Sequence, residues 1–416
     1  MSVLEAPAKS ATPLASLVLA GEAQADATPV TDFIYMSQDV SNAYLVTTSA
    51  GDVLVNAGTA QGGPRHKALF AKVSAAPIKY AVITQSHGDH YGGLNALGGP
   101  DVRVIAERRF PETRAYYDVL APFFRPRTDK LWAAVLGRKG GVTPPDKVTP
   151  DILVDGRYAF ELGGRRFELI STPGGETLDS LTVWMPNEKV AFTGNLFGPV
   201  FMSQPFLCTL RGDKPRNVTT YLSSLQQVRD LDPHILITGH GDPIIGVEKV
   251  RADLTRLHGA VSWLNEAVIA GMNAGKDVHT LMREIRLPPE LAIGEFHGKT
   301  SWNVRSIWES YSGWFHYDST TSLYGVPRSS VDADLVELAG AEALTTRAGG
   351  KVAAGAPLEA IHLVDIVLGA QPGLAPALRV KLDALEALLE AGGGVNLSET
   401  MWLKSEIEAA QAALAR

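Results

Sequence analysis

Cysteine is nearly absent from this sequence, in which Cys208 is the single one among 416 residues. One cysteine cannot form an intramolecular disulfide, and it cannot build a thiolate-rich zinc site. A bound metal must therefore take its ligands mainly from His, Asp, Glu or amide oxygen atoms. The shortage of cysteine also fits a reducing compartment, so we expect a cytoplasmic protein.

The N-terminus lacks the basic segment that a secretory signal needs. Residues 11–20 form a weakly apolar run, but the charges of Glu5 and Lys9 before it cancel. We therefore expect residues 1–28, which are rich in Ala, Ser and Pro, to form a flexible arm. Export to the periplasm is the less favoured alternative. No apolar run in the sequence approaches the ~20 residues that a membrane-spanning helix needs.

Strong positive charge is missing as well. The net charge is −7 and the isoelectric point is near 5.8, which argues against nucleic acid or an anionic membrane as the main partner. There is no Gly-x-Gly-x-x-Gly fingerprint after a strand and no Gly-Lys-Ser/Thr phosphate loop, and this argues against a nucleotide-dependent enzyme. Hydrophobic residues make up 45% of the chain, enough to bury a large core, and we expect a small-molecule substrate.

Short apolar segments rich in β-formers recur along the first half of the chain, and several end in polar, glycine-rich loops. Layered α/β folds place their chemistry on such loops. Beyond residue 325 the chain is rich in Ala and Leu with helical periodicity, so we predict an α/β catalytic domain at 29–325 and an all-α domain at 326–416. The predicted strands are 32–36, 42–48, 52–55, 80–84, 102–106, 168–171, 190–193 and 235–238.

Residues 110–140 interrupt this pattern with many aromatic side chains among prolines and arginines. Two interpretations stay open for this aromatic insert. It is either a helical insert that packs into the core or a lid that faces the substrate.

The densest group of chemically active side chains lies in residues 84–93, TQSHGDHYGG. Imidazole and carboxylate groups are ligands that Zn²⁺ prefers, and the glycines allow a tight turn in which Asp89 and His90 converge on one ion. A short His/Asp cluster on a loop can also be simply polar and solvated. Further ligand-capable residues elsewhere in the chain are therefore needed to support a metal site. Three later apolar runs also end in ligand-capable residues, Glu176, Asn195 and His240.

These segments resemble the metallo-β-lactamase superfamily. Its pattern is His-x-His-x-Asp-His, then Thr-Pro-Gly-His, then a strand ending in Thr-Gly-Asp, then a strand ending in His. Residues 30–250 follow this order, but Gln85 replaces the first His, Glu176 stands near the next ligand position and Asn195 replaces the bridging Asp. The resemblance implies an αββα sandwich and a metal-dependent hydrolase.

The later segments are similar to the linear alkyl sulfatases. Thr209-Leu-Arg211-Gly resembles that family's Leu-Arg-Gly, and His297-Gly-Lys-Thr-Ser-Trp-Asn resembles its segment before the C-terminal region. Residues 350–416 look like its helical dimerisation domain, which implies a homodimer through the C-terminal helices. The resemblance makes Arg211 a candidate for binding a sulfate group, which suits a guanidinium. A structural salt bridge is the alternative.

The departures from the superfamily pattern predict one zinc ion per chain. Gln85 is a poor zinc ligand, and the neutral Asn195 removes the anion that offsets the repulsion between two dications. We therefore expect one zinc ion, whose ligands are Asp89, His90, Asn195 and His240.

His87 is then released from the ligand set. We expect it to act with Asp89 in catalysis, shuttling a proton from metal-bound water. Gln85, Glu176 and Arg211 are candidates for contacting the substrate. The alternative keeps His87 and Glu176 as ligands of a second ion.

The same arrangement resembles the hydrolytic chlorothalonil dehalogenase, whose ligands are an Asp, two His and an Asn with a further His beside the metal-bound water. The leading expectation is therefore that metal-bound hydroxide attacks a small apolar or aromatic substrate, as in hydrolytic dehalogenation or related aryl or ester cleavage. The first alternative is an alkyl sulfate ester hydrolase. The second is a non-catalytic binding protein on a degenerate metal-site scaffold.

Overall fold

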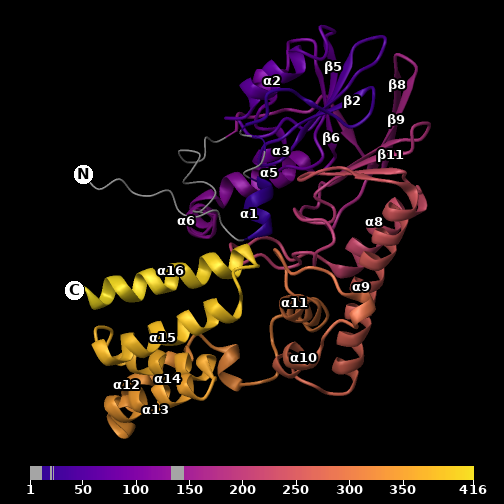
Figure 1. Cartoon of the computed structure of the whole chain (residues 1–416). Coiled ribbons are helices and arrows are strands. Elements are labelled where there is room, and N and C mark those ends of the chain that lie inside the picture. The colour runs from indigo at the N-terminus through magenta and orange to yellow at the C-terminus, as the bar shows by residue number, and fades with distance from the viewer. Residues whose placement is uncertain (1–11, 19–20, 22, 133–144) are drawn as a thin grey trace. The chain divides into compact units, whose positions relative to one another are not determined.

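Residues 12–18, 21, 23–132 and 145–416 are described by the computed structural model of the chain (Figure 1). They divide into two compact units. The first unit contains the described residues as far as Asp129 together with residues 145–311, and the second contains residues 130–132 and Ser312–Arg416. Each unit has its own buried core.

The first sheet of the first unit has its seven strands in sequence order. The first four strands pair antiparallel, and the fourth to seventh pair parallel. Its outer face is covered by α2 (Gly63–Ala71) and α4 (Leu94–Leu97), which bury Leu69, Phe70 and Leu94. The strands are β1 (Thr28–Pro29), β2 (Ile34–Ser37), β3 (Ala43–Val46), β4 (Asp52–Val55), β5 (Ile78–Val82), β6 (Arg103–Glu107) and β7 (Ile152–Val154).

The second sheet has the order β13-β12-β11-β10-β9-β8, and only its β11–β12 pair is parallel. Strand β10 was not among the predicted strands, because it is a fully buried run of residues without the alternation of apolar and polar side chains that marks a half-buried strand. The charged edge strand β8 was also not predicted. The strands are β8 (Arg157–Leu162), β9 (Arg165–Ser171), β10 (Leu181–Met185), β11 (Val190–Gly194), β12 (Ile235–Thr238) and β13 (Ile244–Ile245).

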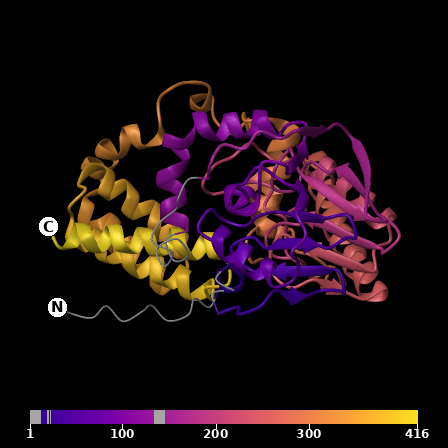
Figure 2. The same cartoon turned by 90° about the horizontal axis from the view of Figure 1, so that it is seen from above.

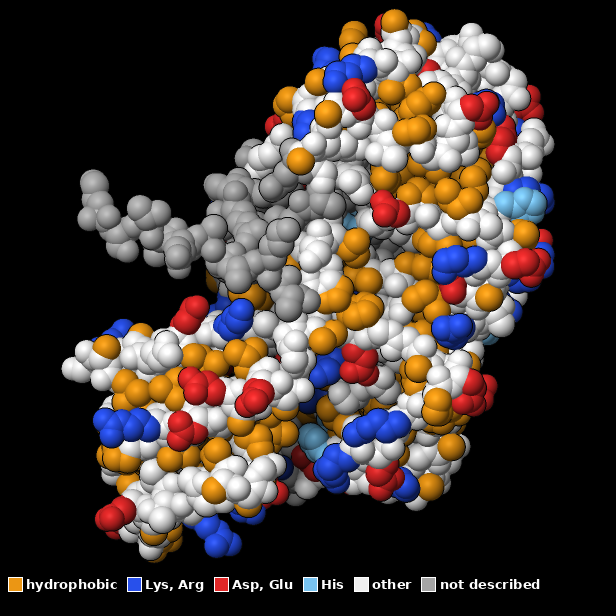
Figure 3. All heavy atoms as spheres, in the orientation of Figure 1, with side chains coloured by type: hydrophobic (Ala, Val, Ile, Leu, Met, Phe, Trp, Pro, Cys, Tyr) orange, Lys and Arg blue, Asp and Glu red, His pale blue; other side chains and the backbone are white. Residues whose placement is uncertain are grey.

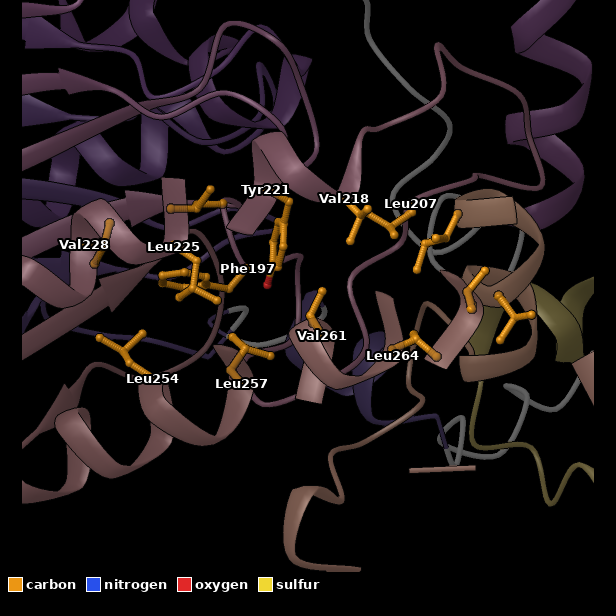
Figure 4. Packing of buried hydrophobic residues seen from close by; sticks show 14 of the residues in the cluster. Phe197, Leu207, Val218, Tyr221, Leu225, Val228, Leu254, Leu257, Val261 and Leu264 are labelled. Carbon is orange, nitrogen blue, oxygen red and sulfur yellow. The ribbon is translucent and has the colours of Figure 1, made fainter. Parts of the chain in front are cut away.

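The two sheets pack face to face around one core, in which Val55 and Ile105 of the first sheet meet Val183 and Phe192 of the second. In Figure 2 the indigo and purple strands lie beside the pink strands. The second sheet is covered by α8 (Val218–Asp230) and α9 (Val247–Asn273), and Figure 4 shows Tyr221 of α8 facing α9. The predicted αββα sandwich is therefore confirmed.

Part of the expected flexible arm is helical in the structure. Leu14, Ala15 and Val18 of α1 (Pro13–Val18) are fully buried. Leu17 packs against Gly241, where a Cβ atom would lie 3.2 Å from Leu17 Cδ2. The composition suggested an arm because a segment rich in Ala, Ser and Pro shows no periodic pattern of apolar side chains. The burial of α1 depends instead on contacts with residues distant in the sequence. Residues 1–11 of the expected arm lie outside the described residues.

The remaining helices of the first unit follow the strands or connect them. Within the described residues, no helix is long and apolar enough to cross a membrane. The helices are α3 (Gly88–Tyr91), α5 (Phe110–Val119), α6 (Ala121–Leu131, ending in the second unit), α10 (Val278–Glu284), the 3₁₀ turn η2 (Pro289–Leu291) and α11 (Thr300–Ser312).

The second unit is helical, as predicted, and small side chains let its helices pack closely. Ala348, Ala360 and Ala384 are fully buried beside Val364 and Val367. After the 3₁₀ turns η3 (Thr320–Leu323) and η4 (Arg328–Val331), the helices are α12 (Asp332–Ala339), α13 (Ala341–Ala353), α14 (Pro357–Ala370), α15 (Ala375–Ala391) and α16 (Leu397–Leu414).

Candidate metal centre

The predicted metal ligands follow strands of both sheets. Asp89 and His90 lie in α3, after β5 of the first sheet, whereas Asn195 and His240 follow β11 and β12 of the second sheet. The parallel strands β11 and β12 end at the same sheet edge, which brings Asn195 and His240 together. The αββα sandwich then places this edge against α3.

Asp89, His90 and His240 form a cluster whose ligand atoms all lie within 4.8 Å of one another. Asp89 Oδ2 is 3.7 Å from His90 Nε2 and 3.9 Å from His240 Nε2. Tetrahedral ligands about 2.0–2.2 Å from one zinc ion lie roughly 3.3–3.6 Å apart, so only a small contraction is needed. The three side chains fit one divalent cation.

Among the residues that the structure describes, His90 Nε2 of this cluster and Asn195 Oδ1 beside it are buried without a hydrogen-bond partner, as is Gln85 Oε1. Burial lowers the pKa of His90 to about 4, which keeps the imidazole neutral, as a metal ligand must be. A Cβ atom on Gly239 would lie 2.1 Å from Asn195 Oδ1 and 2.8 Å from His90 Cε1. Glycine is therefore required here. Both unpartnered atoms are open to a ligand role, whereas Asn195 Nδ2 donates to His240 Nε2 at 2.9 Å, a hydrogen bond that a bound ion would replace.

A second group of side chains converges on the carboxylate of Glu176. Asn195 Nδ2 donates to Glu176 Oε2 at 2.7 Å, and Gln85 Nε2 donates to the same oxygen at 3.3 Å. Burial alone would raise the pKa of Glu176, but the hydrogen bond and charge of His87 hold this pKa well below its ordinary value. Two amide N–H groups therefore face the oxygen that a second cation would need.

His87 lies between Glu176 and the aromatic insert. Its Nδ1 is 2.9 Å from Gln85 Nε2 and 3.3 Å from Glu176 Oε2. Its Nε2 is 3.1 Å from the Tyr117 hydroxyl, and Arg211 Nη2 lies 3.4 Å from the same nitrogen. All eight predicted site residues therefore gather in one place, and His87 lies outside the Asp89, His90 and His240 cluster.

Four residues that the sequence analysis did not assign to the site, Tyr117, Asp213, Arg216 and His297, also belong to it. The Tyr117 hydroxyl donates to Asp213 Oδ2 at 2.9 Å, and Asp213 Oδ2 lies 3.7 Å from Arg216. His297 is buried, its ring centre 4.2 Å from that of Phe206, and burial lowers its pKa to about 3. None of the four follows a predicted strand. The pattern of a strand followed by a ligand-capable residue, which indicated the metal ligands, therefore could not indicate them.

The aromatic insert covers the Arg211 loop. Tyr116, Tyr117, Phe123 and Phe124 contact one another ring to ring. A Cβ atom on Gly212 would lie 3.4 Å from the rings of both Phe123 and Phe124. Phe110, at the start of the insert, is buried against Tyr91 in a core cluster, whereas Phe123 is 51% exposed. The start of the insert therefore packs into the core and residues 116–124 favour the substrate-facing interpretation, and residues 133–144 lie outside the described residues.

Two family models match the chain. Residues 36–240 match the metallo-β-lactamase superfamily, and residues 277–402 match alkyl sulfatase dimerisation. Over 74% of this chain, the sequence is 24% identical to a linear primary-alkylsulfatase of Pseudomonas sp.. Over 88% of this chain, it is 24% identical to an (R)-specific secondary-alkylsulfatase of Pseudomonas sp.. It spans 62% and 58% of the lengths of these two relatives.

The fold is similar to the solved structure of the stereoselective inverting sec-alkylsulfatase Pisa1 from Pseudomonas sp. The TM-score is 0.79 at 22% identity, over 92% of this chain and 65% of Pisa1. The predicted superfamily and the predicted sulfatase-like C-terminal region are confirmed, whereas these matches do not support the dehalogenase comparison. The chain therefore carries a metallo-β-lactamase superfamily domain followed by an alkyl sulfatase dimerisation domain.

Proposed function

We propose that this protein is a metal-dependent hydrolase that cleaves alkyl sulfate esters. The observation that carries the proposal is the position of Arg211, whose guanidinium lies 3.4 Å from His87 Nε2 beside the candidate metal centre. A permanent cation there suits an anionic sulfate group, and both relatives named above are alkylsulfatases. A neutral haloaromatic substrate would leave this charge without a partner. The proposal therefore adopts the first alternative from the sequence, in place of dehalogenation.

We propose a single ion, zinc, held by Asp89, His90, His240 and the unpartnered Oδ1 of Asn195. When bound, such a cation activates water and offsets negative charge on an ester oxygen. The N–H groups of Gln85 and Asn195 that face Glu176 support one ion, because they supply hydrogen bonds where a second cation would supply charge.

The protein's own groups then have separate roles. Arg211 binds and orients the sulfate group. The Tyr117 proton goes to Asp213, so Tyr117 accepts from His87 Nε2. In the neutral ring His87 Nδ1 accepts from Gln85 Nε2 at 2.9 Å; when it takes a proton from the attacking water, that proton faces the Glu176 carboxylate at 3.3 Å, which stabilises the charged ring. Gln85 is fully buried, and both it and Glu176 contact His87. In this proposal they orient His87, whereas the sequence suggested substrate contact.

The experiment compares product release from two substrate classes by the metal-loaded full chain. We expect sulfate release from a medium-chain alkyl sulfate and no halide release from a chlorinated aromatic nitrile. Arg211→Lys keeps the charge but loses the planar guanidinium that can donate two parallel hydrogen bonds to the sulfate group. The KM for the alkyl sulfate should therefore rise by about 10-fold or more. Arg103→Lys, at an exposed position of β6, is the matched control and should leave KM unchanged. Halide release without sulfate release would overturn the proposal.

A further inference from the structure

The loop between β2 and β3 contacts both histidines of the candidate metal centre. The Val40 carbonyl accepts a hydrogen bond from His240 Nδ1, and Ser41 Oγ lies 3.2 Å from His90 Nδ1. We call residues 38–42 the supporting segment. It contains no motif, and neither its composition nor its spacing indicated a role in the site.

These contacts determine which nitrogen of each histidine carries the proton. A backbone carbonyl can only accept, so His240 carries its proton on Nδ1. Its Nε2 lone pair accepts from Asn195 Nδ2 at 2.9 Å, on the side where Asp89 Oδ2 lies 3.9 Å away. The tautomer of a metal-binding histidine is commonly set in this way by the partner of its second nitrogen.

For His90, the hydroxyl of Ser41 donates to the Gly239 carbonyl at 3.2 Å, and that of Thr84 donates to Asn56 Oδ1 at 3.0 Å. Both hydroxyl oxygens can then only accept from His90 Nδ1, which lies 3.2 and 3.4 Å from them. Among the described residues, Asn56 Nδ2, at 3.1 Å, is the one donor that faces this nitrogen. Two acceptors against one donor favour a proton on Nδ1 and a lone pair on the unpartnered Nε2.

The supporting segment is itself tied to the rest of the site. Asp39 Oδ2 accepts from the backbone N–H of Thr59 at 2.9 Å and from its hydroxyl at 2.5 Å. Asn42 donates from its backbone N–H to Gly239 O at 2.8 Å and from its side chain to Gly241 O at 2.7 Å. The residues on both sides of His240 are therefore attached to the same segment that contacts His90.

We infer that Ser41 is a positioning residue for the metal centre, and that the Asp39–Thr59 hydrogen bonds hold it in place. The inference rests on the proposed function, because it requires that Asp89, His90 and His240 bind a metal ion. Ser41 is fully buried. Groups that orient metal ligands change metal affinity by about 10–100-fold when they are removed.

The test measures the Zn²⁺ dissociation constant of the full chain by competition with a chromogenic chelator. Ser41→Ala should weaken zinc binding by about 10-fold. Thr59→Val, which removes one hydroxyl at nearly constant volume from a half-buried residue, should weaken it by about 3-fold, at the low end of such effects. The matched control is Ser224→Ala in α8, where another buried hydroxyl donates to a carbonyl, Pro173 O, at 2.7 Å. That variant should bind zinc with unchanged affinity.

Thermal melting of the metal-free proteins separates positioning from folding. If Ser41→Ala melts like the parent chain yet binds zinc equally well, the inference is overturned while the metal centre stands. If Ser41→Ala does not fold, Thr59→Val takes its place: a Thr59→Val variant that melts like the parent chain yet binds zinc equally well overturns the inference. A parent chain that binds no zinc at micromolar concentration overturns the proposed function instead. An equal loss of affinity in Ser224→Ala also overturns the inference, because it would show a general effect of removing a buried hydroxyl.

Discussion

At the scale of single residues, His87 separates the metal ligands from the groups that act on substrate. Its two nitrogens face Gln85 and Glu176 on one side and Tyr117 and Arg211 on the other. Replacing His87 by Ala should lower the rate of sulfate release by about 10²–10⁴-fold, because a positioned proton acceptor is lost. Metal analysis of the purified protein should still give one ion per chain.

The control for this variant is His258→Ala, which removes a half-buried histidine of α9 whose Nδ1 contacts Ser262 at 3.3 Å. It should change neither turnover nor bound metal. Loss of the metal from the His87 variant would show that His87 is a ligand. Two ions per parent chain at high occupancy would contradict the proposed single ion.

The sequence was informative where chemistry follows a strand directly. Asp89, His90 and His240 could be predicted because each comes after an apolar run whose end lies at the edge of a sheet. Tyr117, Arg216 and His297 could not, since they reach the site from helices and loops through contacts between residues far apart in the chain. The contacts of Ser41 could not be predicted for the same reason, although Ser41 lies only two residues before β3.

At the scale of elements, helices α5 and α6 bring an apolar surface to the Arg211 loop. Phe123 is half-exposed and adjoins Gly212, so it can contact an alkyl chain whose sulfate group is held by Arg211. Burying about half of a phenylalanine contributes roughly 1 kcal/mol, about a 5-fold change in affinity. Phe123→Ala should therefore raise KM about 5-fold for a dodecyl sulfate and little for a butyl sulfate.

Steady-state kinetics over a series of chain lengths measures this effect. Val119→Ala is the control, because Val119 is 77% exposed in α5 and loses little contact area on truncation. An equal rise in KM for short and long chains would indicate a general disturbance of α6 and would contradict a role in binding the alkyl chain.

The elements differ in how well the sequence predicts them. Strands β2, β3, β4, β5, β6, β9, β11 and β12 overlap the predicted segments, because β-branched residues between turn residues mark them clearly. Helix α1 was assigned to an arm, since six residues are too few to show a helical period. Its three buried side chains belong to the tertiary packing.

At the scale of the whole molecule, exposed aromatic side chains mark a surface at the start of the second unit. Trp314 is 73% exposed, Tyr317 90% and Tyr324 69%, and all three lie within the match to alkyl sulfatase dimerisation. Figure 3 shows that apolar side chains, in orange, are also spread over the C-terminal helices. Large apolar side chains gathered on a surface are typical of an interface.

We therefore predict a homodimer in which Trp314 and Tyr317 are covered by the second copy. Size-exclusion chromatography with light scattering at micromolar concentration should give twice the mass of the chain. Trp314→Ser combined with Tyr317→Ser should shift the protein toward the monomer, because aromatic anchors near the centre of an interface supply much of its binding energy. Leu153→Ser, at an exposed position of β7 in the first unit, should remain dimeric. A monomeric parent chain would contradict the homodimer, and a double variant that stays dimeric would place the interface elsewhere on the helices.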